Sequence, residues 1–168
     1  MLKVADYDVV FAEVPDEVTL AMSLSLCPIR CTGCHSQHLW GDVGLELTTD
    51  LVDGLLHRYE GQVTCLCFMG GDNDPEMLHR MAAYVKGNNS GLRLAWYSGQ
   101  PQLPQCWDAS LWNYVKLGPY VKDLGPLSTP TTNQRLYRVD EDGMLVDITY
   151  RLQKGARPQD DTLSIAAR

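Results

Sequence analysis

The chain has no long hydrophobic run, no run of lysine or arginine, no internal repeat and no low-complexity segment. No apolar stretch approaches the length that a membrane-spanning helix needs, so we expect no contact with a membrane. Because basic residues are not clustered and the formal net charge is −7, we expect no nucleic-acid binding either. Residues Met1–Asp6 turn acidic before any apolar run, which argues against a signal peptide. These absences predict a cytoplasmic protein.

The length of 168 residues, of which 45% are hydrophobic, suits one domain with a sizeable core. It is too short for a complete eightfold (β/α) barrel of typical size. We expect a single domain over residues 1–150. Residues 151–168 are polar and uneven in pattern, which predicts a flexible tail.

Half of the six cysteines stand within one short stretch, at Cys27, Cys31 and Cys34. Thiols stay reduced in the cytoplasm, so clustered cysteines there indicate metal binding or catalysis before disulfides. A structural zinc site needs four protein ligands, and neither a second CxxC nor an HxxxH pattern follows. Three thiolates suit an iron–sulfur cluster that keeps one iron free for a substrate. Zinc, buried core cysteines on one helix face and disulfides remain alternatives, although Pro28 and Gly33 disfavour a regular helix.

Strands and helices alternate along most of the chain. Strict alternation from Thr19 to Leu26 predicts a strand, and Thr48 or Thr49 is a suitable helix cap. Asp74 and Pro75 are typical of the first residues of a second helix, which Gly87 should end. Further strands are expected at Tyr7–Ala12, Val63–Met69, Leu92–Tyr97 and Leu111–Leu117, and a β-hairpin from Arg135–Val139 and Met144–Tyr150.

This alternation predicts an α/β fold with a mostly parallel sheet and right-handed crossovers, followed by the hairpin. In such folds, functional groups collect beyond the carboxyl ends of the strands. The cysteine loop follows the strand that begins at Thr19, and Gly70-Gly71-Asp72 follows Val63–Met69. Ser98-Gly99 and Gly118 follow the next two strands. We therefore expect four loops to meet at one edge of the sheet.

The spacing Cys27-x-x-x-Cys31-x-x-Cys34 resembles the signature of the radical S-adenosylmethionine (SAM) superfamily. The sequence is most similar to the activating proteins of anaerobic ribonucleotide reductases, which share the ending Cys31-Thr-Gly33-Cys34. Many of these proteins have glycine before the first cysteine, and an aromatic residue then asparagine after the last. This chain differs there, with Leu26, His35 and Ser36.

Three further stretches carry the resemblance, which runs from about Thr19 to about Val139. Gly70-Gly71-Asp72 resembles the Gly-Gly-acid motif that positions the amino group of SAM, with aspartate in place of the commoner glutamate. Ser98-Gly99 is similar to the Ser-Gly or Thr-Gly at the end of the equivalent strand, which implies a cofactor contact for Ser98. Gly118-Pro-Tyr120, Leu124 and Thr132-Asn-Gln-Arg135 resemble the C-terminal part of the reductase activating proteins.

The resemblance implies an open partial (β/α) barrel of the radical SAM type and a [4Fe–4S] cluster held by Cys27, Cys31 and Cys34. It implies SAM as cofactor, bound by Gly70, Gly71, Asp72 and Ser98. It further implies reductive cleavage of SAM to methionine and a 5′-deoxyadenosyl radical, which makes a glycyl radical on the anaerobic ribonucleotide reductase. The expected electron donor is a one-electron carrier such as flavodoxin. The alternatives are an activase of a formate-lyase-like enzyme, or a non-catalytic iron–sulfur or zinc module for electron transfer.

The remaining cysteines, histidines and tryptophans favour structural interpretations. Cys65 and Cys67 share one face of a strand and are expected in the core, whereas no partner is evident for Cys106. We expect surface or packing roles for His35 and His38, although both flank the cysteine loop. His57 and His79 are expected to be structural or solvated, and Trp40, Trp96, Trp107 and Trp112 to be ordinary core or edge aromatics.

Overall fold

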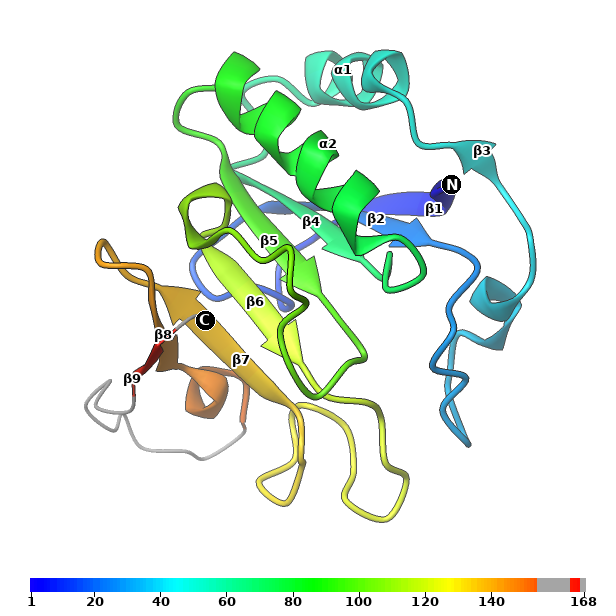
Figure 1. Ribbon diagram of the computed structural model, residues 1–168, viewed down its shortest axis with the longest axis vertical. Coiled ribbons are helices and arrows are strands. Elements are labelled where there is room, and N and C mark those ends of the chain that lie inside the picture. The colour runs from blue at the N-terminus through cyan, green and yellow to red at the C-terminus, as the bar shows by residue number, and fades with distance from the viewer. Residues whose placement is uncertain (154–163, 167–168) are drawn as a thin grey trace.

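The structure, a computed structural model, describes residues 1–153 and, in its last strand, residues 164–166 (Figure 1). Nine strands form one sheet in the order β3-β1-β2-β4-β5-β6-β7-β8-β9. The strands are β1 (Lys3–Val10), β2 (Thr19–Leu24), β3 (Leu45–Glu46), β4 (Cys65–Met69), β5 (Arg93–Tyr97), β6 (Tyr114–Leu117), β7 (Arg135–Val139), β8 (Met144–Asp147) and β9 (Ser164–Ala166). The helices are α1 (Thr49–Arg58) and α2 (Pro75–Asn88), with short 3-10 turns η1 (Gln37–Trp40), η2 (Ala109–Leu111) and η3 (Thr149–Leu152).

The α/β class is confirmed, but the expectation of a mostly parallel sheet is wrong. The central strands β2, β4, β5 and β6 are parallel neighbours. Every other described pair is antiparallel, namely β1 with β2 and β3, β6 with β7, β7 with β8, and β8 with β9. Parallel neighbours need long crossovers, whereas a short turn makes the next strand run back. The sheet is open, because no pairing among the described residues joins β3 to β9.

Both helices begin where the sequence predicts. The side chain of Thr48 accepts a hydrogen bond from the backbone of Leu51, and that of Asp74 accepts one from Met77. Each cap satisfies a backbone N–H that the first helical turn leaves without a partner. Pro75 follows at the first helical position, where its missing N–H costs nothing. The two caps therefore fix the residues at which α1 and α2 begin.

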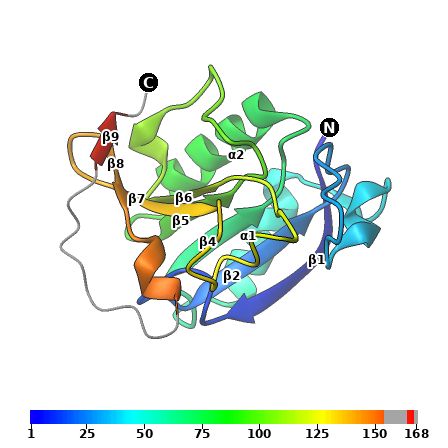
Figure 2. The same cartoon turned by 90° about the horizontal axis from the view of Figure 1, so that it is seen from below.

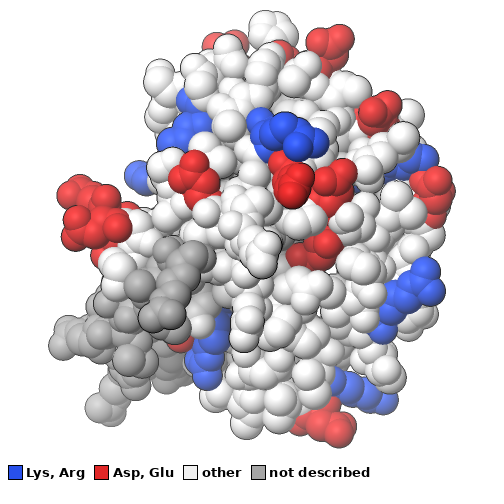
Figure 3. All heavy atoms as spheres, viewed as in Figure 1, with Lys and Arg blue, Asp and Glu red and all other residues white. Residues whose placement is uncertain are grey.

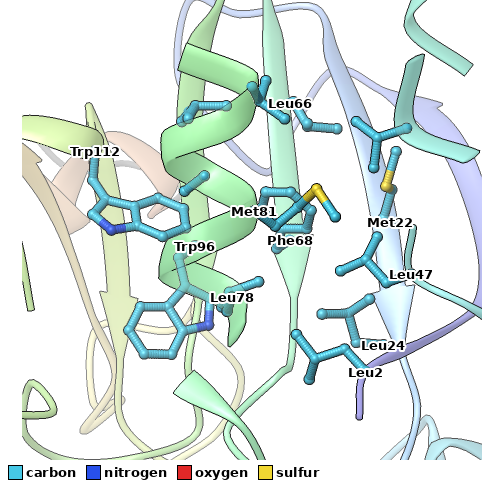
Figure 4. Close-up of a cluster of buried hydrophobic side chains, with 14 of the residues drawn as sticks. Leu2, Met22, Leu24, Leu47, Leu66, Phe68, Leu78, Met81, Trp96 and Trp112 are labelled. Carbon is cyan, nitrogen blue, oxygen red and sulfur yellow. The ribbon is translucent and has the colours of Figure 1, made fainter. Parts of the chain in front are cut away.

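The main core lies between the helices and one face of the sheet (Figures 1 and 2). Leu66 and Phe68 of β4 point toward Leu78 and Met81 of α2 (Figure 4). Each of these side chains is at most 3% exposed. Burying one large apolar side chain stabilises the fold by about 1.5–3 kcal/mol, so this layer holds the helices against the sheet.

A second apolar cluster covers the opposite face of the sheet. Cys65 and Cys67 of β4 lie in it, both fully buried, which confirms their predicted place in the core. They alternate with Leu66 and Phe68, which face the helices, because successive strand residues point to opposite faces. The other buried members come from neighbouring segments, and they are Val14, Ala95, Tyr114, Leu136, Val146 and Ile148.

The predicted C-terminal hairpin is confirmed, since β7 and β8 pair antiparallel around the turn that contains Gly143. β8 ends at Asp147, and Thr149 to Leu152 form η3 instead of continuing the strand. The flexible tail expected at 151–168 stays a prediction. Arg151 belongs to η3, where its side chain pairs with Asp16, and Ser164–Ala166 pair with β8 as β9. Residues 154–163 and 167–168 lie outside the described residues.

No helix in the described part of the chain is long and apolar enough to cross a membrane. On the face shown in Figure 3, acidic and basic side chains are interspersed, and the described residues there form no extended basic patch.

Burial of Cys65 predicts a loss of stability at alkaline pH. Desolvation, with the nearby charge of Glu17, raises the pKa of this thiol from 9.0 to about 12. Above pH 9 the unfolded chain releases a proton that the folded chain retains, so the free energy of unfolding should fall as pH rises. The contribution is roughly 1.4 kcal/mol for each pH unit between the two pKa values.

The measurement is urea unfolding of wild type and Cys65→Val at pH 8 to 10.5. The wild type should lose about 2 kcal/mol more than the variant over this range, because only the wild type carries the Cys65 thiol, which ionises in the unfolded chain but not in the folded one. Equal slopes in the two proteins would contradict the burial of this thiol.

Candidate functional site

The four loops that the sequence predicts to meet do lie at one edge of the sheet. Because β2, β4, β5 and β6 are parallel neighbours, their carboxyl ends point the same way (Figure 1). The cysteine loop, Gly70–Asp72, Ser98-Gly99 and Gly118 follow these four strands in that order. The expectation of a shared edge is therefore confirmed.

The cysteine loop runs between β2 and η1 without regular structure. Its backbone is held by hydrogen bonds from Cys27 N–H to the Leu39 carbonyl, at 3.0 Å, and from Cys34 N–H to the Cys31 carbonyl, at 3.1 Å. Arg30 and Gly33 have positive φ angles, of 49° and 79°. A helix cannot contain such angles, so the alternative of three cysteines on one helix face is excluded.

The thiols of Cys27, Cys31 and Cys34 are free and partly exposed. The alternatives of buried core cysteines and of disulfides therefore fail for all three. Among the described residues, no three side chains of His, Cys, Asp or Glu lie close enough together to hold one metal ion. The loop thus brings the three thiols to one edge of the sheet without converging them on a single point.

Leu26, directly before Cys27, has a φ of 61°. This left-handed conformation costs an ordinary residue roughly 1–2 kcal/mol and glycine almost nothing. The turn is enforced from outside the loop, because the N–H of Leu26 donates to the Gly41 carbonyl at 3.2 Å. This is why β2 ends at Leu24 instead of continuing to Leu26 as the alternation predicts.

Gly70 and Gly71 both have positive φ angles, of 107° and 93°. A Cβ on Gly70 would lie 3.0 Å from the carbonyl oxygen of Leu24, and one on Gly71 would lie 3.1 Å from side-chain atoms of Leu24 and Leu78. Glycine is therefore needed here so that the loop after β4 can lie tightly between β2 and α2.

Asp72 is held by the loop that follows β5. Its Oδ1 accepts a 2.5 Å hydrogen bond from the Ser98 hydroxyl, and its Oδ2 accepts a 2.9 Å bond from the N–H of Gly99. The Ser98 hydroxyl in turn accepts from the N–H of Gln100 at 3.0 Å. Ser98 is fully buried, so its side chain positions Asp72 and is not exposed to an incoming ligand. A carboxylate has about four acceptor positions, so Asp72 keeps capacity for a further donor.

The cysteine loop packs against the loops that follow β5 and β6. A Cβ on Gly99 would lie only 2.7 Å from Ile29 of the cysteine loop. A Cβ on Gly33 would lie 3.6 Å from the Tyr120 ring, and that ring lies 5.8 Å, between centroids, from His35. Gly99 thus permits a close approach, and a larger residue there would push the cysteine loop away.

The two C-terminal stretches singled out by the resemblance pack together. The side-chain amide of Asn133 donates to the Pro119 carbonyl at 3.0 Å. A Cβ on Gly118 would lie 3.2 Å from the Cα of Gln134, which is buried. These contacts indicate that the stretch around Asn133 and Gln134 supports the loop after β6.

Sequence reasoning missed Lys116, which lies on β6 and is only 8% exposed. Its Nζ donates to the carbonyl oxygens of Gly118, at 2.8 Å, and of Ser98, at 3.2 Å. Burial lowers the pKa of this amine to about 8, although the charges of Asp72, Cys31 and Cys27 favour its protonated form. The available signal was a lysine inside an otherwise apolar strand, Tyr114-Val-Lys-Leu117.

Three other histidines and Cys106 contact residues outside these four loops. His38 approaches Asp6 at 3.5 Å and His57 approaches Glu60 at 3.6 Å, both as exposed pairs. His79 is buried and packs edge-on against three indole rings, those of Trp96, Trp107 and Trp112. Cys106 does have a neighbour, because its sulfur lies 3.8 Å from Nδ1 of His79.

Leu26 provides a test of the turn that carries the cysteines. Leu26→Gly and Leu26→Ala both remove the side chain, but only glycine relieves the left-handed backbone. The free energy of unfolding should be about 1 kcal/mol higher for the glycine variant than for the alanine variant, so the glycine variant is the more stable. Denaturant unfolding of both variants measures the difference.

Leu39, which also lies near this turn but has no positive φ, is the matched control. There the order should reverse, because glycine loses more backbone entropy than alanine on folding. The same order at both positions would contradict the left-handed conformation of Leu26.

In comparisons with protein-family models, curated proteins and solved structures, none matched this chain. Its function is therefore inferred from the residues at this edge and from their geometry.

Proposed function

We propose that this protein is a radical SAM activating enzyme that makes a glycyl radical on a large partner, the anaerobic ribonucleotide reductase. The observation that carries the proposal is that a CxxxCxxC loop lies beside a Gly-Gly-Asp loop at the carboxyl edge of parallel strands. In this proposal the open sheet is a partial (β/α) barrel of the radical SAM type. The cofactors are a [4Fe–4S] cluster and SAM.

By their chemistry the residue types at this edge suit both cofactors, and binding of a cluster would require the loop to draw its three thiols together. The donor set of Cys27, Cys31 and Cys34 is three soft thiolates with no carboxylate, which suits iron–sulfur clusters better than magnesium or calcium. Gly70 and Gly71 let the loop pack tightly against Leu24, and in this proposal their backbone would bind the amino end of SAM beside Asp72. Together, the two cofactors supply one-electron reductive cleavage of SAM, which yields methionine and a carbon-centred radical.

The chain's own residues would bind and orient the ligand. Asp72 would accept from the ammonium group of SAM, since its remaining acceptor positions are not used by Ser98 or Gly99. Ser98 would fix the carboxylate against rotation, because its hydroxyl is itself held by Gln100. A held carboxylate loses less entropy on binding than a mobile one.

The partner would cover the exposed edge. Val121 and Leu124, in the loop after β6, are 37% and 38% exposed. A macromolecular substrate placed there would exclude water, so the small chain would need no closed barrel. A one-electron donor such as flavodoxin would supply the electron.

Formation of 5′-deoxyadenosine tests the activity. The protein is reconstituted with iron and sulfide without oxygen, then mixed with SAM and a strong reductant. Wild type should release 5′-deoxyadenosine and methionine, and Cys31→Ala should release neither. Cys106→Ala, which removes a cysteine outside the loop, should behave as wild type. An intact cluster that yields no product, with and without the reductase, would favour an electron-transfer module instead.

Asp72→Asn tests the ammonium contact separately. This variant removes the charge while an amide oxygen can still accept one of the two bonds. SAM should bind at least about tenfold more weakly, which corresponds to roughly 1.4 kcal/mol. Equilibrium binding with unreduced protein measures this, and unchanged affinity would refute the role given to Asp72.

Alkylation by iodoacetamide tests the ligand set without any turnover. The metal-free folded protein should react at Cys27, Cys31, Cys34 and Cys106, which are partly exposed, and not at the buried Cys65 and Cys67. After reconstitution only Cys106 should remain reactive, because cluster ligation masks the other three. Mass spectrometry identifies the labelled residues. Continued labelling of any of the three loop cysteines would remove it from the ligand set.

A further inference from the structure

Lys116 is a buried cation at the edge that carries the cysteines. Its ammonium donates to the carbonyl oxygens of Ser98 and Gly118 and lies 5.9 Å from the centroid of the Tyr97 ring. These contacts use neutral groups, and among the ion pairs of the described residues Lys116 forms none. A buried charge without an opposite charge is costly to fold. The chain therefore retains a charge here that its own carboxylates do not neutralise by direct contact.

The position of this charge is fixed by the loops around it. Ser98 precedes Gly99, against which Ile29 of the cysteine loop packs. Gly118 begins the loop whose Tyr120 ring packs beside Gly33. The ammonium is thus hydrogen-bonded to the same two loops against which the cysteine loop packs. The lysine side chain cannot move into solvent without breaking both hydrogen bonds.

The amine is charged near neutral pH. Burial lowers its pKa to about 8, which still leaves most molecules protonated at pH 7. Among the groups whose charges favour this proton, Asp72 has the largest effect. Lys116 is therefore a mostly protonated, buried cation on a strand that ends at the edge carrying the cysteine loop.

We propose that Lys116 supplies a fixed, buried positive charge to the anionic cluster held by the cysteine loop, and thereby makes that cluster easier to reduce. This inference rests on the proposed function, because it requires that the loop holds an iron–sulfur cluster. Reduction adds one negative charge to a group already bearing three thiolates. A cation nearby stabilises the reduced form more than the oxidised form.

The size of the effect follows from Coulomb's law. For a separation of about 10 Å and an effective dielectric constant of about 20, a unit charge changes a one-electron equilibrium by roughly tenfold. A tenfold change corresponds to about 59 mV for one electron. Exposed charges are screened by salt much more strongly than buried ones.

The midpoint potential of the reconstituted cluster, measured without SAM, tests the proposal. Lys116→Met and Lys116→Gln are both neutral, and the glutamine amide can still donate to the two carbonyl oxygens. Both variants should lower the midpoint potential by about 59 mV, which is a tenfold shift of the equilibrium toward the oxidised cluster. Lys116→Arg keeps the charge and should retain the wild-type potential. Lys122→Met, which removes an exposed lysine near Gly33, should cause a smaller shift that disappears at high salt.

Iron and sulfide content and thermal unfolding are measured for every variant. Wild-type potentials in both neutral variants, with intact clusters, would overturn the inference and leave the proposed function standing. A shift in Lys116→Met that Lys116→Gln lacks would also overturn it, because hydrogen bonding and not charge would then be responsible. Failure of the wild type to bind iron and sulfide would instead refute the proposed function.

Discussion

Parallel pairing of β2, β4, β5 and β6 is the constraint on which the candidate site depends. It brings the ends of four strands, separated by up to about a hundred residues of chain, to one edge. The pairing is held by the apolar layer under α1 and α2 and by the second cluster on the opposite face. Loops beyond this edge carry little core, so their residues can serve a ligand without weakening the fold.

A connected set of hydrogen bonds joins three of these loops. Lys116 reaches the Ser98 carbonyl, and the Ser98 hydroxyl reaches Asp72. The indole of Trp96 also donates to the Gly70 carbonyl, at 2.8 Å. A buried lysine, a buried serine and a tryptophan from neighbouring strands thus hold the Gly-Gly-Asp loop in place. Such support keeps a binding group rigid, which is how binding sites are made precise.

The cysteine loop is held differently. Its left-handed turn at Leu26 is stabilised by the segment around Gly41, and its far side rests on Gly99 and on the Tyr120 ring. The loop therefore combines a backbone fixed by distant contacts with three thiols that remain partly exposed.

Local patterns in the sequence determined the helix caps at Thr48 and Asp74 and the hairpin around Gly143, and the alternation of strands with helices predicted the common edge of the four loops. They succeeded because a cap, a turn and an alternation depend on residues only a few positions apart. Tertiary structure decided the antiparallel flanks of the sheet, the partners of Asp72, the burial of Lys116 and the strained turn at Leu26. Each of these depends on contacts between segments far apart in the chain, and no local pattern encodes which segments will meet.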